Sequence, residues 1–341
     1  MSDIEKQNNC HHIYYFNGTT EKTLEGFYKE PEDYKPGEMY NLYFCLKCSH
    51  IEIVDYNLED DTPVQEFEAA NTVIKSDKSY KEIKKELVQS LYEFKEFLEY
   101  NRIQYSIMSG TMLGCIRHGG FIPWDDDIDI AMLRTEYEKM LEIFRKNPNI
   151  NEHLYASGAE IDDSELPFVK IYNTKIKVED EALVNTEYLW IDVFPFDGLP
   201  KRNFRMFEKY INNLKRVYHY RRRDWTRNCD DIRNFRAKRV VTKISRIVSD
   251  KKYVKFLIHE CSKYNTNNVE RVEDLTWGNK SIPRFLFDDF VEYKFENITV
   301  KGFKEFDTYL RCIYGDYMQL PPERDRINHG IKAWRINNNE E

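Results

Sequence analysis

The chain lacks two features of exported and membrane-embedded proteins. No uninterrupted apolar run approaches the roughly 18–20 residues that a helix needs to cross a bilayer. The first residues, MSDIEKQNNC, contain neither the basic stretch nor the apolar stretch of a signal peptide. These absences predict a cytoplasmic protein. The seven cysteines are an odd number, which argues against a disulfide framework in that reducing compartment.

Apolar residues are not lacking, and basic residues are concentrated in one segment. With 41% apolar and 15% aromatic residues, the 341-residue chain can bury a core and has room for two domains. The net charge is −8, but residues 201–255 contain 19 Lys and Arg against 5 Asp and Glu, a net of +14. Helical spacing of its apolar residues predicts a basic helical insertion over residues 201–264. This insertion is either a solvated surface or a face that attracts anions.

Four carboxylates crowd into five positions within SGTMLGCIRHGGFIPWDDDIDI, residues 109–130. They are Asp125, Asp126, Asp127 and Asp129, and apolar residues flank them. Repelling charges on a half-buried segment cost stability unless a positive charge compensates them, and Mg²⁺ or Mn²⁺ takes carboxylate oxygens as ligands. We therefore expect a divalent metal here. A run of Asp on a solvated loop or at a helix cap is the alternative.

The spacing of the carboxylates indicates a strand. Alternate side chains of a strand share a face, so Asp127 and Asp129 point one way while Ile128 and Ile130 point into a core. A third carboxylate from a neighbouring strand would complete such a site. Asp192 lies among apolar neighbours in LWIDVFP and is the candidate, because an uncompensated charge would be costly there.

Upstream of the carboxylates, Ser109-Gly110-Thr111 separates an apolar run from a short helical stretch at residues 112–117. A strand that turns into a helix start offers backbone N–H groups and a dipole to a phosphate. Gly-Ser/Thr followed by D-x-D is typical of the nucleotidyltransferase fold. The sequence therefore predicts an α/β (α+β) catalytic domain of that type.

Four stretches resemble the LicD family, which includes the catalytic domains of fukutin and fukutin-related protein. They are SGTMLGCIRHGGFIPWDDDIDIAM (109–132), LPFVKIYNTK (166–175), WIDVFPFDGLP (190–200) and YGDYMQLPPERDR (314–326). The resemblance implies transfer of a phosphorylated alcohol, such as phosphocholine, from a CDP-linked donor to a glycan hydroxyl, with release of CMP. Such reactions modify lipopolysaccharide, teichoic acid or capsule. The chain departs from the family at Gly119, where many members have a basic residue.

The residues and the resemblance together assign roles to the carboxylates. Asp127, Asp129 and Asp192 would hold one or two Mg²⁺ or Mn²⁺ ions that neutralise the donor diphosphate. Asp125 or Asp126 would accept the proton of the attacking hydroxyl, or would orient the loop.

The remaining polar residues of these motifs would bind the donor. Gly110 and Thr111 would cradle a phosphate at the helix start, and Arg117 and Lys170 would clamp phosphate oxygens. His118 would contact phosphate or serve as a structural residue of the loop.

The partners implied are a CDP-linked donor and a glycan or lipid-linked glycan acceptor, with peripheral contact of the basic insertion to the inner membrane face. A choline group would call for an aromatic cage. The candidate aromatic residues, Trp124, Tyr172, Trp190 and Trp225, are scattered in sequence. Two other functions stay open: a nucleotidyltransferase that uses an NTP, and a module that binds nucleic acid or a protein partner.

Metal-ligand spacing of another kind occurs near the N-terminus. A C-x-H pair and a C-x-x-C pair can bind tetrahedral Zn²⁺ through Cys10, His12, Cys45 and Cys48, and His11 or His50 is an alternative ligand. Strand-like segments at 12–16, 40–44 and 50–56 complete a zinc-ribbon-like module over residues 1–56. A set of reduced surface cysteines is the alternative.

The rest of the chain divides as follows. Residues 57–79 are expected to be a linker, residues 80–335 the catalytic domain and residues 336–341 a disordered tail. An amphipathic helix is expected at 80–100 and a second from Thr135, its N-cap, to Arg145. Strands are expected at 166–172 and 183–193.

Overall fold

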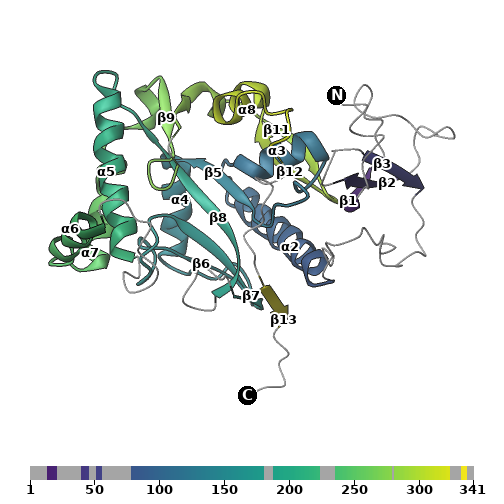
Figure 1. Ribbon diagram of the computed structural model, residues 1–341, viewed down its shortest axis with the longest axis horizontal. Helices are drawn as coiled ribbons and strands as arrows, with labels where there is room; N and C mark the ends of the chain where they lie inside the picture. Colours follow the sequence, from purple (N-terminus) through teal and green to yellow (C-terminus); the bar gives the residue numbers. More distant parts are fainter. Residues whose placement is uncertain are drawn as a thin grey trace, which may run out of the picture.

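An eight-stranded mixed sheet is the central element of the fold in the computed structural model (Figure 1). The structure describes residues 14–20, 40–45, 51–55, 78–179, 187–222, 235–278, 280–322 and 332–335. The strands of the sheet are β4 (Ser106–Ile107), β5 (Asp129–Leu133), β6 (Leu154–Ser157), β7 (Val169–Glu179), β8 (Glu187–Gly198), β9 (Arg271–Glu273), β10 (Ile282–Pro283) and β13 (Lys332–Arg335). Among these strands β5 and β8 pair in parallel, whereas their other neighbours pair antiparallel. The predicted α+β class is confirmed.

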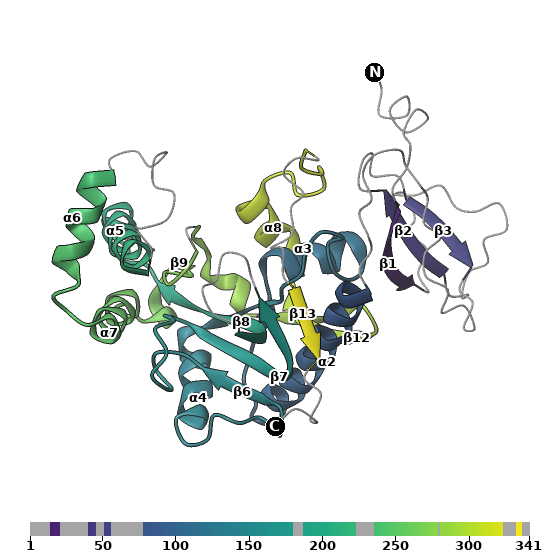
Figure 2. The same cartoon turned by 60° about the horizontal axis from the view of Figure 1, so that its bottom comes forward.

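Helices cover the sheet because their apolar stripes need a partner. The helix α2 (Lys78–Tyr100) buries its predicted stripe, which consists of Ile83, Leu87, Leu91, Phe94 and Leu98. In Figure 2, α2 and α4 (Arg134–Phe144) lie below the strands, and α3 (Ser109–His118) and α8 (Phe306–Tyr314) lie above them. A hairpin of β11 (Phe290–Phe295) and β12 (Ile298–Phe303) packs against α2, α3 and α8. Two short 3₁₀ turns, η1 (Thr266–Asn268) and η2 (Arg284–Phe287), complete the fold.

The start of α4 differs from the prediction. The helix begins at Arg134, its N-cap is Leu133, and no side chain caps it, so the predicted Thr135 cap is wrong. The reason is a tertiary contact: Arg134 Nε and Nη2 donate to the two carboxylate oxygens of Asp197 at 2.7 and 2.8 Å. This buried pair fixes the first turn, and a hydroxyl cap is not needed.

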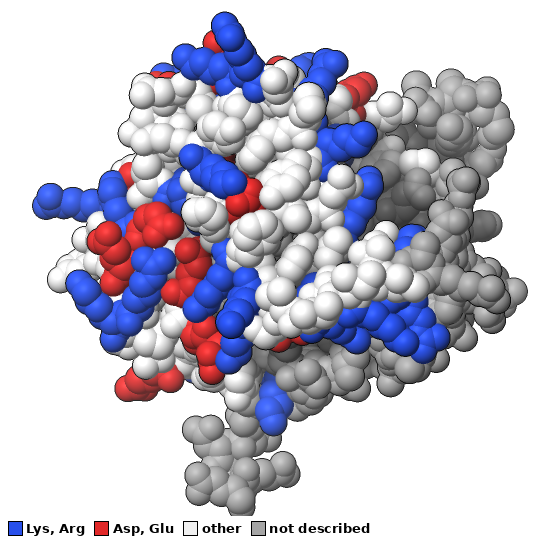
Figure 3. Space-filling model, turned by 90° about the vertical axis from the view of Figure 1, so that its left-hand side faces the viewer, with Lys and Arg blue, Asp and Glu red and all other residues white. Residues whose placement is uncertain are grey.

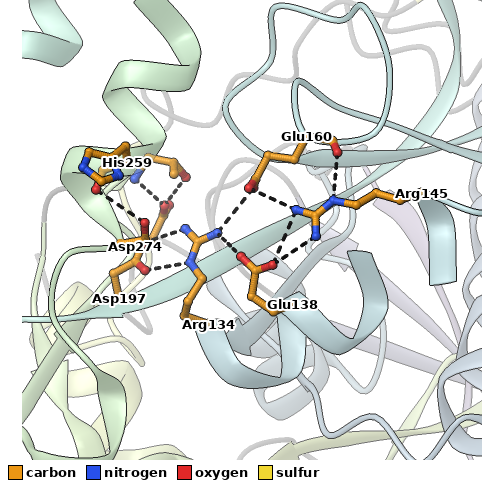
Figure 4. Close-up of polar contacts among 9 residues, drawn as sticks. Arg134, Glu138, Arg145, Glu160, Asp197, His259 and Asp274 are labelled. Atoms are coloured by element: carbon orange, nitrogen blue, oxygen red, sulfur yellow. Dashed lines mark hydrogen bonds and ion pairs between the residues drawn. The ribbon is translucent and has the colours of Figure 1, made fainter. Parts of the chain in front are cut away.

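The Arg134–Asp197 pair is the centre of a charged network (Figure 4). Arg134 also lies 3.5 Å from Glu160 and 3.8 Å from Glu138, and Arg145 reaches both of these carboxylates at 3.5 Å. The network ties β8, α4 and the segment between β6 and β7 together. It lies beyond the carboxyl end of β5, away from the Asp-rich segment that precedes that strand.

Next to this network, Glu273 of β9 pairs in register with Asp197 of β8 and is itself buried. Burial raises the pKa of Glu273 to about 8, against the nearby Lys215 and with help from Glu208. Between pH 4.5 and about 8, the Glu273 carboxyl group therefore keeps its proton in the folded protein, whereas the same group is ionised in the unfolded chain.

Replacing Glu273 by Gln is expected to flatten the pH dependence of stability. In the native chain, the free energy of unfolding should fall as pH rises from 4.5 to about 8, because the folded state binds the extra proton in that window. The slope is at most about 1.4 kcal/mol per pH unit. Urea unfolding across this window measures it, with the exposed Glu270→Gln as control. An unchanged slope in Glu273→Gln would contradict the raised pKa.

The basic insertion is helical, as predicted. It contains α5 (Phe204–Arg222), α6 (Phe235–Ser245) and α7 (Asp250–Cys261). A small core separate from that of the sheet holds α5 and α7 together, with Ile211, Tyr218, Val254 and Leu257 among its members. None of the helices in the described part of the chain combines the length and the apolar character needed to cross a bilayer.

The N-terminal strands also follow the prediction. The strands β1 (Tyr14–Thr20), β2 (Tyr40–Cys45) and β3 (Ile51–Asp55) form an antiparallel sheet in the order β1-β2-β3. Of the proposed zinc ligands, Cys10, His12 and Cys48 lie outside the described residues. Cys45 ends β2, and its side chain is likewise not described. The zinc site stays a prediction.

Candidate functional site

A pocket of about 640 Å³ lies where α3, the Asp-rich segment and the residues around the end of α8 meet. It is lined by Ser109, Gly110, Leu113, Arg117, Ile122, Trp124, Asp125, Asp127, Asp129, Tyr314, Asp316, Tyr317, Gln319, Leu320, Pro321 and Pro322. Residues from two of the motifs found in the sequence, 109–132 and 314–326, thus line the same pocket.

The sheet register places Asp129 and Asp192 side by side. They are paired residues of the parallel strands β5 and β8, and the amide of Asp192 donates to the Ile128 carbonyl at 2.9 Å. The alternation predicted from the spacing is present, since Ile128 and Ile130 are fully buried and Asp127 and Asp129 are partly exposed. The strand itself begins at Asp129, so Asp127 lies in the extended segment before it.

The carboxylates in this cluster repel one another. Burial raises the pKa of Asp129 well above its usual range, and the charges of Asp127, Asp192 and Asp125 add to the increase. The pKa of Asp125 is raised by burial and by Asp127. Asp126 is buried and is not among the residues that line the pocket.

Asp192 is held in place from two sides. The indole Nε1 of Trp190 donates to Asp192 Oδ2 at 3.1 Å, and Lys170 Nζ lies 3.8 Å from Asp192 Oδ1. The same ammonium group lies 3.7 Å from the centre of the Trp190 ring. Lys170 therefore pairs with a carboxylate and is not among the residues that line the pocket.

At the start of α3, Ser109 and Gly110 line the pocket. A Cβ at position 110 would overlap the carboxylate of Asp125, so only glycine lets that carboxylate lie against the first turn. The Thr111 hydroxyl instead faces β5, where it accepts a hydrogen bond from the amide of Asp129 at 2.9 Å. Gly110 therefore contributes to the pocket wall, whereas Thr111 connects α3 to β5.

Arg117 faces the pocket and is fixed by two hydrogen bonds. Its Nε donates to His118 Nε2 at 2.9 Å, and its Nη1 donates to the Tyr317 carbonyl at 2.8 Å. His118 is buried, and burial together with the charges of Arg117 and Lys84 lowers its pKa well below 6.5. A neutral His118 that orients Arg117 agrees with the structural alternative for this residue.

Lys84 lies on α2, and the amphipathic pattern of that helix alone would leave this side chain on the solvated face. The structure shows instead that its Nζ donates to the carbonyls of Ile122 and Pro123 at 3.3 and 3.4 Å. Burial lowers its pKa to about 8, against the attraction of Glu296, Asp125 and Asp126. Lys84 directly follows Ile83, the first residue of the buried stripe on α2. This neighbourhood was the only feature of the sequence that could have indicated that the Lys84 side chain points inward.

Aromatic side chains from both motifs line the pocket. Trp124 comes from the Asp-rich segment, and Tyr314 and Tyr317 follow from the far end of the chain. The Tyr317 hydroxyl donates to Asp307 at 2.9 Å, which holds that ring in place. Of the other aromatic candidates, Trp190 supports Asp192, Tyr172 stacks on Tyr155, and Trp225 lies outside the described residues.

Oxygen atoms are the donors that the carboxylate cluster would offer to a metal ion. Among the residues that the structure describes, no group of three or more His, Cys, Asp or Glu side chains has the arrangement of a formed metal site. The donors of this cluster are carboxylate oxygens with raised pKa values, a set that suits a hard divalent cation. The type of donor atom therefore fits Mg²⁺ or Mn²⁺, and binding of either ion stays a prediction.

Comparisons with known proteins agree on one family. Residues 102–226 match the family described as LicD/FKTN/FKRP, nucleotidyltransferase domain. The chain is similar to the lipopolysaccharide cholinephosphotransferase LicD of Haemophilus influenzae, with 26% identity over 249 residues, which cover 70% of this chain and 91% of that protein.

Two further relatives match only a short part of the chain. An uncharacterized protein of Rickettsia typhi is 40% identical over 63 residues, 18% of this chain and 20% of the relative. A second, from Rickettsia prowazekii, is 46% identical over 50 residues, 15% of this chain and 19% of the relative.

Proposed function

Because the chain belongs to the LicD family, we propose that it is a phosphotransferase that moves phosphocholine from a CDP-linked donor to a glycan hydroxyl, releasing CMP. The observation that carries the proposal is the pocket, in which a carboxylate cluster, a helix start and an aromatic wall face the same space. The similarity to a lipopolysaccharide cholinephosphotransferase supports the choice of choline and of a glycan acceptor.

The acceptor oxygen would attack the phosphorus that carries choline, and the bond from that phosphorus to the CMP oxygen would break. Asp125 is the candidate to take the hydroxyl proton, since it lines the pocket and its raised pKa makes its carboxylate a stronger base than an ordinary Asp. Asp126 is buried away from the pocket lining, which favours its role in orienting the loop.

The phosphates of the donor would lie between the start of α3 and the carboxylates. The amides of the first turn and the guanidinium of Arg117 favour negative charge at this end of the pocket. Asp127, Asp129 and Asp192 would hold Mg²⁺ or Mn²⁺, which when bound neutralises the diphosphate and stabilises the leaving CMP. Trp190 and Lys170 would keep Asp192 in position.

The choline group would lie against the aromatic wall. A trimethylammonium group has no hydrogen bond to donate, and aromatic faces and a nearby carboxylate are the groups that attract it. Trp124, Tyr314 and Tyr317 supply the faces, and Asp316 supplies the charge.

Thermal stabilisation by CDP-choline, CDP-ribitol, CMP, CTP and ATP in the presence of Mg²⁺ or Mn²⁺ tests the proposal. We expect CDP-choline to stabilise the protein most. Replacing Tyr314 by Leu should weaken CDP-choline binding by about 2- to 30-fold, the value of one cation–π contact, and leave CMP binding unchanged. Tyr92 is as exposed as Tyr314, at 42%, but lies on α2 outside the pocket lining, so Tyr92→Leu is the control.

Two results would contradict this assignment. Stabilisation by CTP or ATP alone would point to a nucleotidyltransferase that uses an NTP. No response to any nucleotide would favour a module that binds nucleic acid or a protein.

A further inference from the structure

Aliphatic side chains project into solvent from α6 and the turn that follows it. Val240, Ile244 and Ile247 are 54%, 63% and 84% exposed, and Val241 and Val248 are also exposed. Their spacing of three and four residues places them along one stripe. We call these five residues the α6 stripe.

The opposite side of α6 is anchored to α5. The Thr242 hydroxyl is buried, with the Lys238 carbonyl at 2.9 Å and the Tyr220 carbonyl at 3.4 Å. Arg221 of α5 is buried and donates to the carbonyls of Ser245 and Val248 and to Asp250. The segment is therefore fixed to α5 at Thr242, Ser245 and Val248, and this orientation turns the stripe outward.

Positive charge surrounds the α6 stripe. Arg239, Lys243 and Arg246 alternate with its members, and Lys251 and Lys252 follow at the start of α7, all of them exposed. Figure 3 views the side of the molecule on which α5, α6 and α7 lie, and Lys and Arg side chains project over much of it beside a smaller group of Asp and Glu. The excess of +14 over residues 201–255 thus coincides with the exposed aliphatic residues.

We propose that the α6 stripe docks on an anionic lipid surface, with its aliphatic side chains in the headgroup region and the Lys and Arg against lipid phosphates. An exposed aliphatic stripe edged by Lys and Arg is the pattern of helices that lie in a membrane interface. Nucleic acid would match the positive charge of this surface but not its aliphatic side chains. Single strands stack their bases on aromatic rings, and the α6 stripe contains no aromatic residue. The proposal does not depend on the phosphotransferase assignment, although it would bring the pocket to an acceptor carried by a lipid.

Co-sedimentation of the full chain with vesicles tests the docking. Phosphatidylcholine vesicles are compared with vesicles of phosphatidylcholine and phosphatidylglycerol, at low and high salt. We expect binding to the anionic vesicles alone, weakened by salt, and at least about tenfold weaker binding for Ile247→Glu. Ile247→Ser separates loss of the apolar side chain from gain of a charge and should weaken binding by a smaller factor.

Phe285→Glu is the matched control, since Phe285 is 52% exposed on η2 in the catalytic part and the charge change is the same. Circular dichroism verifies that each variant is folded. Equal binding to both kinds of vesicle, equal losses for Ile247→Glu and Phe285→Glu, or binding of RNA in place of vesicles would overturn the proposal. Turnover of a water-soluble acceptor should be the same in Ile247→Glu and the native chain, which keeps this test separate from that of the proposed function.

Discussion

Replacing Asp129 by Asn is expected to abolish turnover and, at the same time, to stabilise the protein in the absence of divalent metal. Asp129 is repelled by the other carboxylates of the cluster. Burial raises its pKa, and the charges of Asp127, Asp192 and Asp125 raise it further. The folded state therefore disfavours ionised Asp129, whereas Asn carries no charge at any pH. The loss of a metal ligand should lower kcat by about a thousandfold or more, which corresponds to several kcal/mol of transition-state stabilisation.

The measurement pairs two assays on the same preparation. Transfer from CDP-choline is followed by release of CMP, and the melting temperature is recorded without metal and with Mg²⁺ or Mn²⁺. Asp163→Asn is the control, because the Asp163 side chain is 92% exposed and lies outside the pocket lining. Full activity in a folded Asp129→Asn variant would refute the assignment of this residue. A variant less stable than the native chain would refute the repulsion argument.

Replacing Arg134 by Met should cause the largest loss of stability. Its guanidinium makes two hydrogen bonds with Asp197, whose side chain is fully buried, so the substitution leaves a buried carboxylate without its cation. Breaking a buried pair from one side costs about 3–5 kcal/mol. Urea unfolding gives the free energy, and the double variant Arg134→Met with Asp197→Leu should recover part of it, since both charges are then removed.

Arg145→Met provides the comparison within the same network. The Arg145 side chain is 42% exposed, lies 3.5 Å from the carboxylates of Glu138 and Glu160, and donates to the Glu160 carbonyl at 3.2 Å, so its loss should cost no more than about 1 kcal/mol. Equal losses for the two Arg variants would show that the buried pair contributes no more than a surface one.

The sequence was most informative where local periodicity reports burial. The α2 stripe, the alternation around Asp129 and the helices of the insertion each depend on spacing alone, and each is present in the structure. Asp192 was proposed because its neighbours are apolar, and the register of β5 and β8 places it beside Asp129. Its role as a ligand stays a prediction, as do the roles of the other site residues.

The sequence was least informative where a contact depends on distant residues. The α4 start was assigned to Thr135 because a hydroxyl is the usual cap, but an ion pair with Asp197, 63 residues away from Arg134, determines it. The inward position of Lys84 depends on carbonyls 38 and 39 residues along the chain. Local spacing carries no information about such partners, and for the same reason Trp124 was a candidate for the aromatic wall but Tyr314 and Tyr317 were not.

The wall of the pocket also sets an order of events during synthesis. The amide of Ser109 bonds to the Tyr309 hydroxyl and the guanidinium of Arg117 to the Tyr317 carbonyl, and each bond spans 200 residues. A ribosome adds about 5–20 residues per second, so the carboxylate cluster emerges roughly 10–40 s before the segment that encloses it. During that interval the nascent chain has its acidic groups but no closed pocket. The pocket is therefore completed only after residues 309–322 have been added, and a chain that stops before α8 lacks part of the pocket lining.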